Sequence, residues 1–126
     1  MIIPENLKYT KDHEWLRTEG EFAYIGVSEY AQGELGDVVF VEVNTVGETL
    51  NKKEAFGTIE AVKTVSDVFM PVSGEVLEFN SLLESNPEVI NKDPYGEGWI
   101  VKIKISNIEE ANDLMDSEQY KEQIGH

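Results

Sequence analysis

The sequence predicts a mostly β fold with short flanking and C-terminal helices, and three observations support this prediction. Most of the chain consists of short stretches rich in β-branched and aromatic residues, which favour strands. Glycine, proline, asparagine and aspartate separate these stretches at turn-like spacings. The helix-capping patterns that occur accompany short segments. With 126 residues, of which 40% are hydrophobic, the chain is expected to form a single domain, residues 1–126, around one packed core.

The first predicted elements are a β-hairpin and a short helix. Residues 14–18 and 21–27 have the composition of strands and flank a Glu-Gly pair, which is a turn signal. Ser28 is the expected N-cap of a helix over residues 29–35, because its hydroxyl can accept a bond from a free backbone N–H of the first turn. Gly36 is expected to end this helix, since glycine adopts the left-handed backbone conformation of many helix ends.

The central part of the chain is expected to form four strands. Residues 37–43 are apolar at most positions, which predicts a strand buried on both faces in the middle of a sheet. A polar connection over residues 44–54 leads to two strand-like arms, which occupy residues 57–69 on either side of Lys63. Residues 74–80 form the next expected strand.

The C-terminal third is expected to combine one strand with short helices. Residues 99–105 alternate apolar and polar side chains, which predicts a half-exposed strand. A capping-box pattern begins at Ser106, and Ser117 is expected to cap a last helix, so that a helical tail covers about residues 107–124. The shorter expected features are one helical turn at residues 81–84 and loops at residues 86–87 and 93–98.

The chain is strongly acidic, with 25 aspartates and glutamates against 10 lysines and arginines and a formal net charge of −15. This balance speaks against nucleic acid and anionic membranes as partners, because both would repel the protein. It fits partner proteins with basic docking surfaces, or an acidic surface that only adds solubility. No apolar run reaches the length of a membrane span, and the N-terminus has no signal-like character. A bacterial cytoplasmic location is the simplest expectation.

The residues that most often carry catalysis are scarce. The chain has no cysteine, and its only histidines are His13 and His126, so the sequence offers no ligand set for a metal. No nucleophile motif of the Gly-x-Ser-x-Gly kind occurs, and no phosphate-binding glycine loop precedes Lys63 and Thr64. With 25 acidic residues, a chance pair of carboxylates is inevitable and does not indicate acid–base catalysis. The sequence therefore favours a non-catalytic role.

Lys63 is the most informative residue, because it is the only cation between Glu54 and Glu75. The stretches on its two sides have similar lengths and the composition of strands, so a hairpin would hold the lysine at its tip. A primary amine in that position suits covalent attachment of a carboxylic-acid cofactor. The alternative is an ordinary solvent-exposed lysine in a strand. It stays open, because no Asn-Gly or Asp-Gly turn occurs at this point.

Residues 56–68, followed by residues 71–76, resemble the lipoyl-lysine hairpin of the glycine cleavage system H protein family. The resemblance extends over nearly the whole chain. Two departures are Ala61, where a serine is common in the family, and Met70, where other residues are usual; neither removes the lysine amine. The other matching segments, in the order of the family, are residues 7–9, 13–15, 25–32, 35–43 and 89–99.

The resemblance implies a flattened barrel-sandwich hybrid of the lipoyl- and biotinyl-carrier type, with the modified lysine at a hairpin tip. It implies a carrier and not an enzyme, with lipoate in amide linkage on Lys63 and a reach of roughly 14 Å from the backbone. The carrier would take an aminomethyl group from glycine decarboxylase (P protein) to the tetrahydrofolate-dependent aminomethyltransferase (T protein). It would then bring the dithiol to dihydrolipoamide dehydrogenase (L protein). A lipoate-attaching enzyme is a further implied partner, and a monomer is the simplest expected state.

The resemblance also suggests residues that serve the attached arm. Glu14 and Asp67 are expected to line a cleft that holds the protonated amine of the loaded arm, and Asp12 is a further candidate. Glu60, three residues before Lys63, is expected to help the attaching enzyme recognise the tip. For all four residues, the alternative is an ordinary surface carboxylate that only adds solubility.

Several other functions stay open from the sequence. A biotin carrier shares the hairpin architecture, although methionines typically flank its lysine where Val62 and Thr64 stand here. A lipoyl domain of a larger acyltransferase would bring a linker and a catalytic region. An unmodified interaction module would use the acidic surface alone. The sequence also does not decide whether the chain donates lipoate to other lipoyl proteins.

Overall fold

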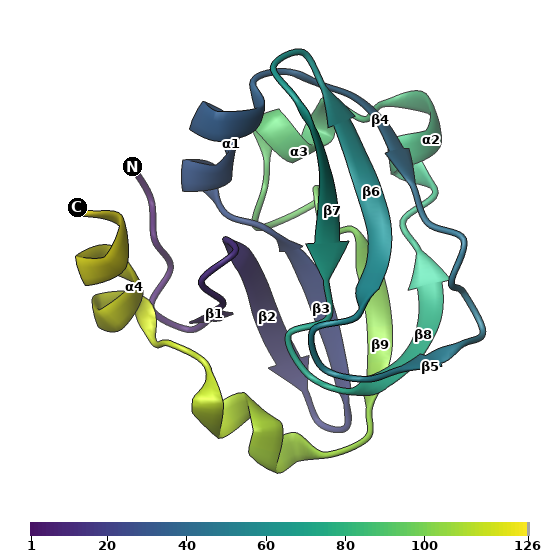
Figure 1. Cartoon of the computed structure of the whole chain (residues 1–126), viewed down its shortest axis with the longest axis vertical. Coiled ribbons are helices and arrows are strands. Elements are labelled where there is room, and N and C mark those ends of the chain that lie inside the picture. Colours follow the sequence, from purple (N-terminus) through teal and green to yellow (C-terminus); the bar gives the residue numbers. More distant parts are fainter. Residues whose placement is uncertain (126) are drawn as a thin grey trace.

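The computed structural model describes residues 1–125, which form two antiparallel sheets surrounded by short helices (Figure 1). The six strands of the larger sheet are, in spatial order, β1 (Lys8–Tyr9), β2 (Glu14–Glu19), β3 (Phe22–Val27), β9 (Val101–Ile105), β8 (Gly74–Phe79) and β5 (Thr49–Leu50). The three strands of the smaller sheet are, in spatial order, β4 (Val38–Glu42), β6 (Ala55–Ala61) and β7 (Val65–Phe69).

The helices are short and lie around the two sheets. The first, α1 (Glu29–Leu35), connects β3 to β4 and lies beside the tip of the β6–β7 hairpin (Figure 1). Between β8 and β9 the chain forms α2 (Leu82–Ser85) and α3 (Val89–Lys92). After β9, the 3-10 helix η1 (Ile108–Asp113) and α4 (Ser117–Ile124) return along the side of the molecule where β1 lies (Figure 1).

The two sheets share one hydrophobic core. Because side chains alternate along a strand, β9 points every second residue inward, and Val101 and Ile103 are completely buried. Phe56 and Ile59 of β6 are completely buried in the same cluster. Burial of a side chain of this size contributes roughly 1.5–3 kcal/mol relative to an exposed position. This core therefore fixes the smaller sheet, which carries Lys63, on the larger one.

A second apolar cluster joins the N-terminal segment to α4. Tyr9 of β1 stacks on Tyr120 of α4, with ring centroids 4.5 Å apart and an angle of 2° between the ring planes. Trp15 belongs to the same cluster, and a Cβ atom at Gly26 on the neighbouring strand would lie 2.6 Å from its ring. Position 26 therefore accommodates only glycine beside this tryptophan. The cluster holds α4 against β1 and β2, next to the candidate site.

The structure confirms the mostly β prediction and several individual elements. β2 and β3 pair as the predicted hairpin, with Glu19 opposite Phe22. α1 covers the predicted residues, and Gly36 follows it with a left-handed φ of 73°. β8 and β9 lie within the predicted segments 74–80 and 99–105. Local alternation and turn residues were sufficient to place these elements.

The prediction that residues 37–43 form a central strand is wrong. β4 is an edge strand of the smaller sheet, and β6 is the central strand. The pairing of β4 with β6 shifts register between Val38 and Phe40. As a result two successive side chains, Val39 and Phe40, face outward and are 52% and 51% exposed. An apolar run does not by itself distinguish a central strand from an edge strand with a bulge.

The predicted capping bonds of the Ser28 and Ser106 side chains are absent. Ser28 occupies the N-cap position of α1, but its hydroxyl lies 2.6 Å from the Tyr120 hydroxyl and makes no bond to the helix backbone. Ser106 does not begin a capping box. Asn107 caps the 3-10 helix instead, because its side chain accepts a bond from the Glu109 N–H.

The C-terminal helices differ from the predicted continuous tail. Asp116, and not Ser117, is the N-cap of α4 and forms a capping box with it. The segment 107–124 is not helical throughout, because Met115 interrupts it and pairs with Tyr9 in an isolated β-bridge. The interruption lets the chain turn back along β1 before α4 begins.

Two short elements of the structure were not predicted from the sequence. Thr49–Leu50, in the polar connection, form β5 and pair with β8. α3 lies between the two predicted loops. Both elements are too short to produce a recognisable period in the sequence. Within residues 1–125, no helix has the length and apolar character needed to cross a membrane.

Candidate functional site

β6 and β7 form a hairpin whose tip consists of residues 62–64. The Ala61 N–H closes the tip by donating to the Thr64 carbonyl at 3.0 Å. Lys63 stands at this tip with an exposed side chain. The hairpin geometry that the sequence left open is therefore present, although no Asn-Gly or Asp-Gly pair forms the turn.

The tip is tied to the end of α1 by three hydrogen bonds. The Val62 N–H donates to the Asp37 carbonyl at 2.9 Å, and the Lys63 N–H donates to the Leu35 carbonyl at 3.0 Å. The Lys63 ammonium donates to the Gly33 carbonyl at 2.9 Å. Figure 1 shows the hairpin tip reaching over to α1. A loop held in this way presents its lysine in a defined direction.

Glu14 begins β2 and is almost completely buried, with 2% of its surface exposed. The Thr10 hydroxyl donates to one carboxylate oxygen at 2.6 Å, and the Phe69 N–H donates to the other at 3.1 Å. Burial raises the pKa of Glu14 to about 7, and these two hydrogen bonds act in the opposite direction. Glu14 is therefore not an ordinary surface carboxylate. It links β2 to the end of β7 and can exchange a proton near neutral pH.

A cavity of about 250 Å³, the smaller cavity, lies between α1 and the β6–β7 hairpin. Asp12, Glu34 and Asp67 line it, together with His13. Asp67 is exposed, and its carboxylate accepts a bond from the Thr58 hydroxyl at 3.1 Å. Carboxylates beside an apolar wall suit an organic cation. The apolar wall consists of Val27, Ala31, Leu35, Ile59, Val65 and Val68.

Asp12 also lines a second cavity of about 410 Å³, the larger cavity, to which Glu14 contributes. Lys52 and Lys53 line the larger cavity as well, so its charge is mixed. The structure thus brings Asp12 and Asp67 together in one cavity, and Asp12 and Glu14 together in the other. Glu14 and Asp67 line different cavities. They are connected through β7, since the Glu14 carboxylate bonds to a backbone N–H two residues beyond Asp67.

Glu60 lies on β6 close to the tip and is exposed. Its register partners are Phe40 on β4 and Val65 on β7. Register partners in an antiparallel sheet point to the same face, and both of these residues are exposed as well. The outer face of the hairpin therefore presents a carboxylate between two apolar side chains, a few residues from Lys63.

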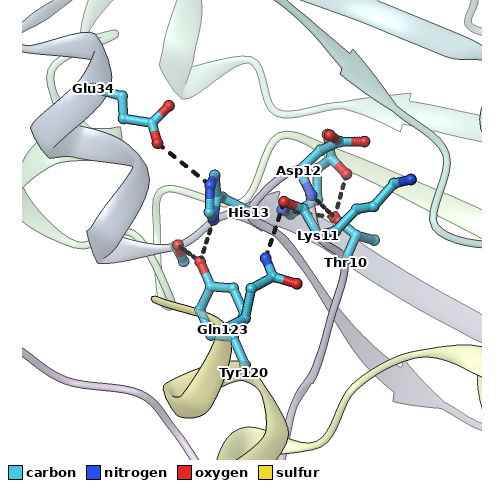
Figure 2. A network of polar contacts seen from close by, with 9 residues as sticks. Thr10, Lys11, Asp12, His13, Glu34, Tyr120 and Gln123 are labelled. Atoms are coloured by element: carbon cyan, nitrogen blue, oxygen red, sulfur yellow. Dashed lines mark hydrogen bonds and ion pairs between the residues drawn. The ribbon is translucent and has the colours of Figure 1, made fainter. Parts of the chain in front are cut away.

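A polar network that sequence reasoning missed holds the turn of residues 10–13 (Figure 2). His13 has a left-handed φ of 72°, which is uncommon for a residue other than glycine. Its Nδ1 lies 2.8 Å from the Tyr120 hydroxyl, and its Nε2 lies 3.4 Å from the Glu34 carboxylate. Figure 2 shows His13 between α1 and α4, bridging the two helices.

α4 makes a second bond to the same turn. The Gln123 side chain donates to the Lys11 carbonyl at 3.1 Å. The Tyr120 hydroxyl also lies 2.6 Å from the Ser28 hydroxyl, and burial raises the pKa of Tyr120 to about 12, so this group keeps its proton. The only signal in the sequence was that His13 is the sole interior histidine.

Comparisons with known proteins agree with this arrangement. The family model described as Glycine cleavage H-protein matches residues 7–126. The glycine cleavage system H protein of Bacteroides thetaiotaomicron is 60% identical over 121 residues, which cover 96% of each chain. That of Staphylococcus carnosus is 50% identical over 125 residues, or 99% of each chain. The crystal structure of a glycine cleavage system H protein from Mycobacterium marinum has a TM-score of 0.89 at 35% identity and covers 98% of this chain and 100% of that chain.

Two sheets that present a lysine on a hairpin tip, together with the structural match, define a carrier domain of the lipoyl type. The matches also identify the particular carrier, because they extend over nearly the whole chain. The chain belongs to the glycine cleavage H-protein family, the lipoate-bearing carriers of glycine cleavage. The resemblance found in the sequence and the fold that it implied are confirmed. A biotin carrier and a lipoyl domain of an acyltransferase do not agree with this membership.

Proposed function

We propose that this chain carries lipoate in amide linkage on Lys63 and serves the glycine cleavage system as a carrier without catalytic chemistry of its own. The observation that supports this most directly is the exposed Lys63 amine on a hairpin tip that is tied to α1. Once attached, the dithiolane of lipoate supplies the sulfur pair that takes up and releases the aminomethyl group of glycine. In this role residues 1–126 act as one carrier domain.

The residues around Lys63 fit an attached group of this kind. The amine is exposed, so an attaching enzyme can reach it. Gly36 leaves space beside the lysine stem that a larger residue would fill. Glu60 is proposed to contact the attaching enzyme, because its exposed carboxylate lies between Phe40 and Val65 on the face next to the tip.

The smaller cavity is proposed to hold the cationic end of the loaded arm. Asp12, Glu34 and Asp67 give this cavity negative charge, and carboxylates bind a protonated amine by charge-assisted hydrogen bonds. Glu14 acts through β7, since its bond to the Phe69 N–H holds the strand that carries Asp67. With a pKa of about 7, Glu14 is present in both protonation states at neutral pH.

The proposed partners are glycine decarboxylase, the aminomethyltransferase and dihydrolipoamide dehydrogenase, which the tip would visit in turn, and a lipoate-attaching enzyme. The net charge of −15 supports docking on basic surfaces of these enzymes. A monomer can visit several enzymes most simply. The bacterial relatives support the cytoplasm of a bacterium as the place of action.

The proposal is tested by lipoate attachment followed by peptide mass mapping. Wild-type protein is incubated with a lipoate–protein ligase, ATP and lipoate, beside a Lys63→Arg variant and a Lys8→Arg control. We expect one lipoyl addition on residues 56–70 in the wild type and in the control, and none in Lys63→Arg. Lipoylation of the Lys63→Arg variant, or an unmodified Lys63 in protein from the native host, would contradict the proposal.

A further inference from the structure

The C-terminal end of α1 leaves backbone carbonyls that need partners from outside the helix, as helix ends do. The Gly36 N–H donates to the Gln32 carbonyl at 2.7 Å. Lys63 satisfies two of the others. Its backbone N–H donates to the Leu35 carbonyl at 3.0 Å, and its ammonium donates to the Gly33 carbonyl at 2.9 Å. One residue of the hairpin tip therefore caps the helix through both its backbone and its side chain.

Gly36 makes this contact possible because it has no side chain. A Cβ atom at position 36 would lie 3.1 Å from Cγ, 3.5 Å from Cδ and 3.6 Å from Cε of Lys63. The first of these distances is too short for two carbons without movement of one of them. The φ of 73° at Gly36 would also strain any other residue. The lysine stem thus runs along the backbone of Gly36.

We infer that the Gly33 carbonyl and the Gly36 backbone form a cradle that fixes the Lys63 side chain, so that an attached group pivots at Nζ and not at the backbone. This inference rests on the proposed attachment of lipoate to Lys63. Acylation removes the positive charge but leaves one N–H on the nitrogen, and the Gly33 carbonyl needs only one donor. The contact that holds the amine therefore persists in the amide.

The position of the pivot matters because α1 also forms a wall of the smaller cavity. Ala31, Glu34 and Leu35 of α1 line this cavity. Thr64, next to Lys63 at the hairpin tip, lines the cavity as well, so a group attached to Nζ starts close to the cavity. With the lysine stem held, only the bonds of the attached group remain free to rotate. Gly36 is therefore a positioning residue for the arm, together with the backbone carbonyl of residue 33.

The direct test measures the mobility of the lysine stem by NMR relaxation in protein with ¹³C-labelled lysine, before and after lipoylation. Lys63 is compared with Lys8, an exposed lysine on β1. We expect the order parameter of Cε in Lys63 to be about twofold that of Lys8 in both forms of the protein. Gly36→Ala is expected to lower the Lys63 value to that of Lys8.

Gly20→Ala is the matched control for this variant. Gly20 has a similar left-handed φ of 67°, but a Cβ atom there meets nothing within 4 Å. We expect the control to leave the order of Lys63 unchanged. Amide spectra of both variants report whether α1 and the β6–β7 hairpin are folded.

Two outcomes would overturn the inference. The first is that Lys63 is as mobile as Lys8 in the wild-type protein, a measurement that does not depend on whether a variant folds. The second is a folded Gly36→Ala variant in which the order parameter of Cε in Lys63 is unchanged. Failure of a ligase to modify Lys63 would instead contradict the proposed function, and the comparison in unmodified protein would still decide whether the cradle exists.

Discussion

Glu14 shows how burial changes the chemistry of a single carboxyl group. Exclusion of water disfavours the charged form, whereas the hydrogen bonds from Thr10 and Phe69 favour it. Burial is the larger effect, so the pKa rises from 4.5 to about 7. The folded protein therefore binds a proton over a pH range in which the unfolded chain has already released it.

This difference makes the free energy of unfolding depend on pH. Between pH 4.5 and about 7 the folded state holds more protons at Glu14, so its contribution to stability should fall as pH rises through this window. The loss is on the order of 3 kcal/mol for a shift of this size. Glu14→Gln should remove this part of the pH dependence. Urea unfolding near both ends of this pH window measures the free energy of unfolding. Glu84→Gln, a substitution at an exposed site, is the control. A variant with the wild-type pH profile would contradict the assignment.

Asp12 and Asp67 should help to retain a cation in the smaller cavity. Both side chains are exposed, so water screens their charge and the effect of each is modest. In lipoylated protein, the double variant Asp12→Asn and Asp67→Asn should lose the bound aminomethyl group about fivefold faster. Mass spectrometry over time measures the loss. Asp37→Asn, close to the tip but not among the lining residues, is the control, and equal rates in all three proteins would exclude a role for the cavity carboxylates.

Among the elements, α4 supports the candidate site from outside the sheets. The turn of residues 10–13 belongs to no helix or strand, and the left-handed backbone of His13 is unfavourable by itself. Contacts from Tyr120 and Gln123 hold this turn in place. Because the turn gives Asp12 and His13 to the smaller cavity, a helix distant in sequence determines the shape of the site.

Tyr120→Phe removes one hydroxyl and keeps the ring that stacks on Tyr9. It should lower the free energy of unfolding by about 1–2 kcal/mol, because the Ser28 hydroxyl and the His13 ring both lose a partner. Amide hydrogen exchange in the turn of residues 10–13 should become faster. Tyr30→Phe is the control, since this ring lies 4.7 Å from the His13 ring. Unchanged exchange in the Tyr120 variant would show that α4 does not hold the turn.

The elements also show which parts of the fold a sequence can predict. The hairpin around Gly20 was predictable, because the alternation and turn residues that form it are neighbours in the chain. Around Lys63 the composition predicted two strands, but the turn between them stayed open because no Asn-Gly or Asp-Gly pair marks it. The edge position of β4 was not, because strand order depends on partners far away in sequence. Asp116 and Ser117 are adjacent and both suit an N-cap, so only the backbone path decides between them.

The candidate site follows the same division. Lys63 was found from its isolation as a cation and from a family resemblance, and both are properties of a local segment. The sequence could not show that Asp12 lines two cavities, or that Glu34 and Tyr120 meet at His13. The contact between His13 and Tyr120 joins residues 107 positions apart, so it exists only after the whole chain has folded.

The molecule as a whole is a folded body with a large negative charge. Its 25 acidic residues outnumber its 10 lysines and arginines, so most carboxylates have no basic side chain of their own. Within residues 1–125, four lysine or arginine side chains pair with a carboxylate, and each of these carboxylates is exposed, so the pairs contribute little to stability. The excess negative charge therefore mainly affects the rate at which this protein associates with a basic partner.

Salt should slow the association of this protein with a basic partner enzyme. Raising the ionic strength shortens the range of the attraction, so the association rate should fall about tenfold between low and high salt, while the dissociation rate changes less. Stopped-flow binding measures both rates, with sucrose at equal osmolality as the control. An association rate that is independent of salt concentration would show that docking does not use the acidic surface.

The register shift in β4 also affects whether copies of this chain associate with one another. An outer strand with free backbone N–H and carbonyl groups and outward apolar side chains is a template on which another molecule can add a strand. The register shift between Val38 and Phe40 breaks the even spacing that such growth requires. Asp37 and Glu42 place like charges at both ends of the strand. The register shift and these charges are therefore expected to disfavour the addition of a strand from another copy.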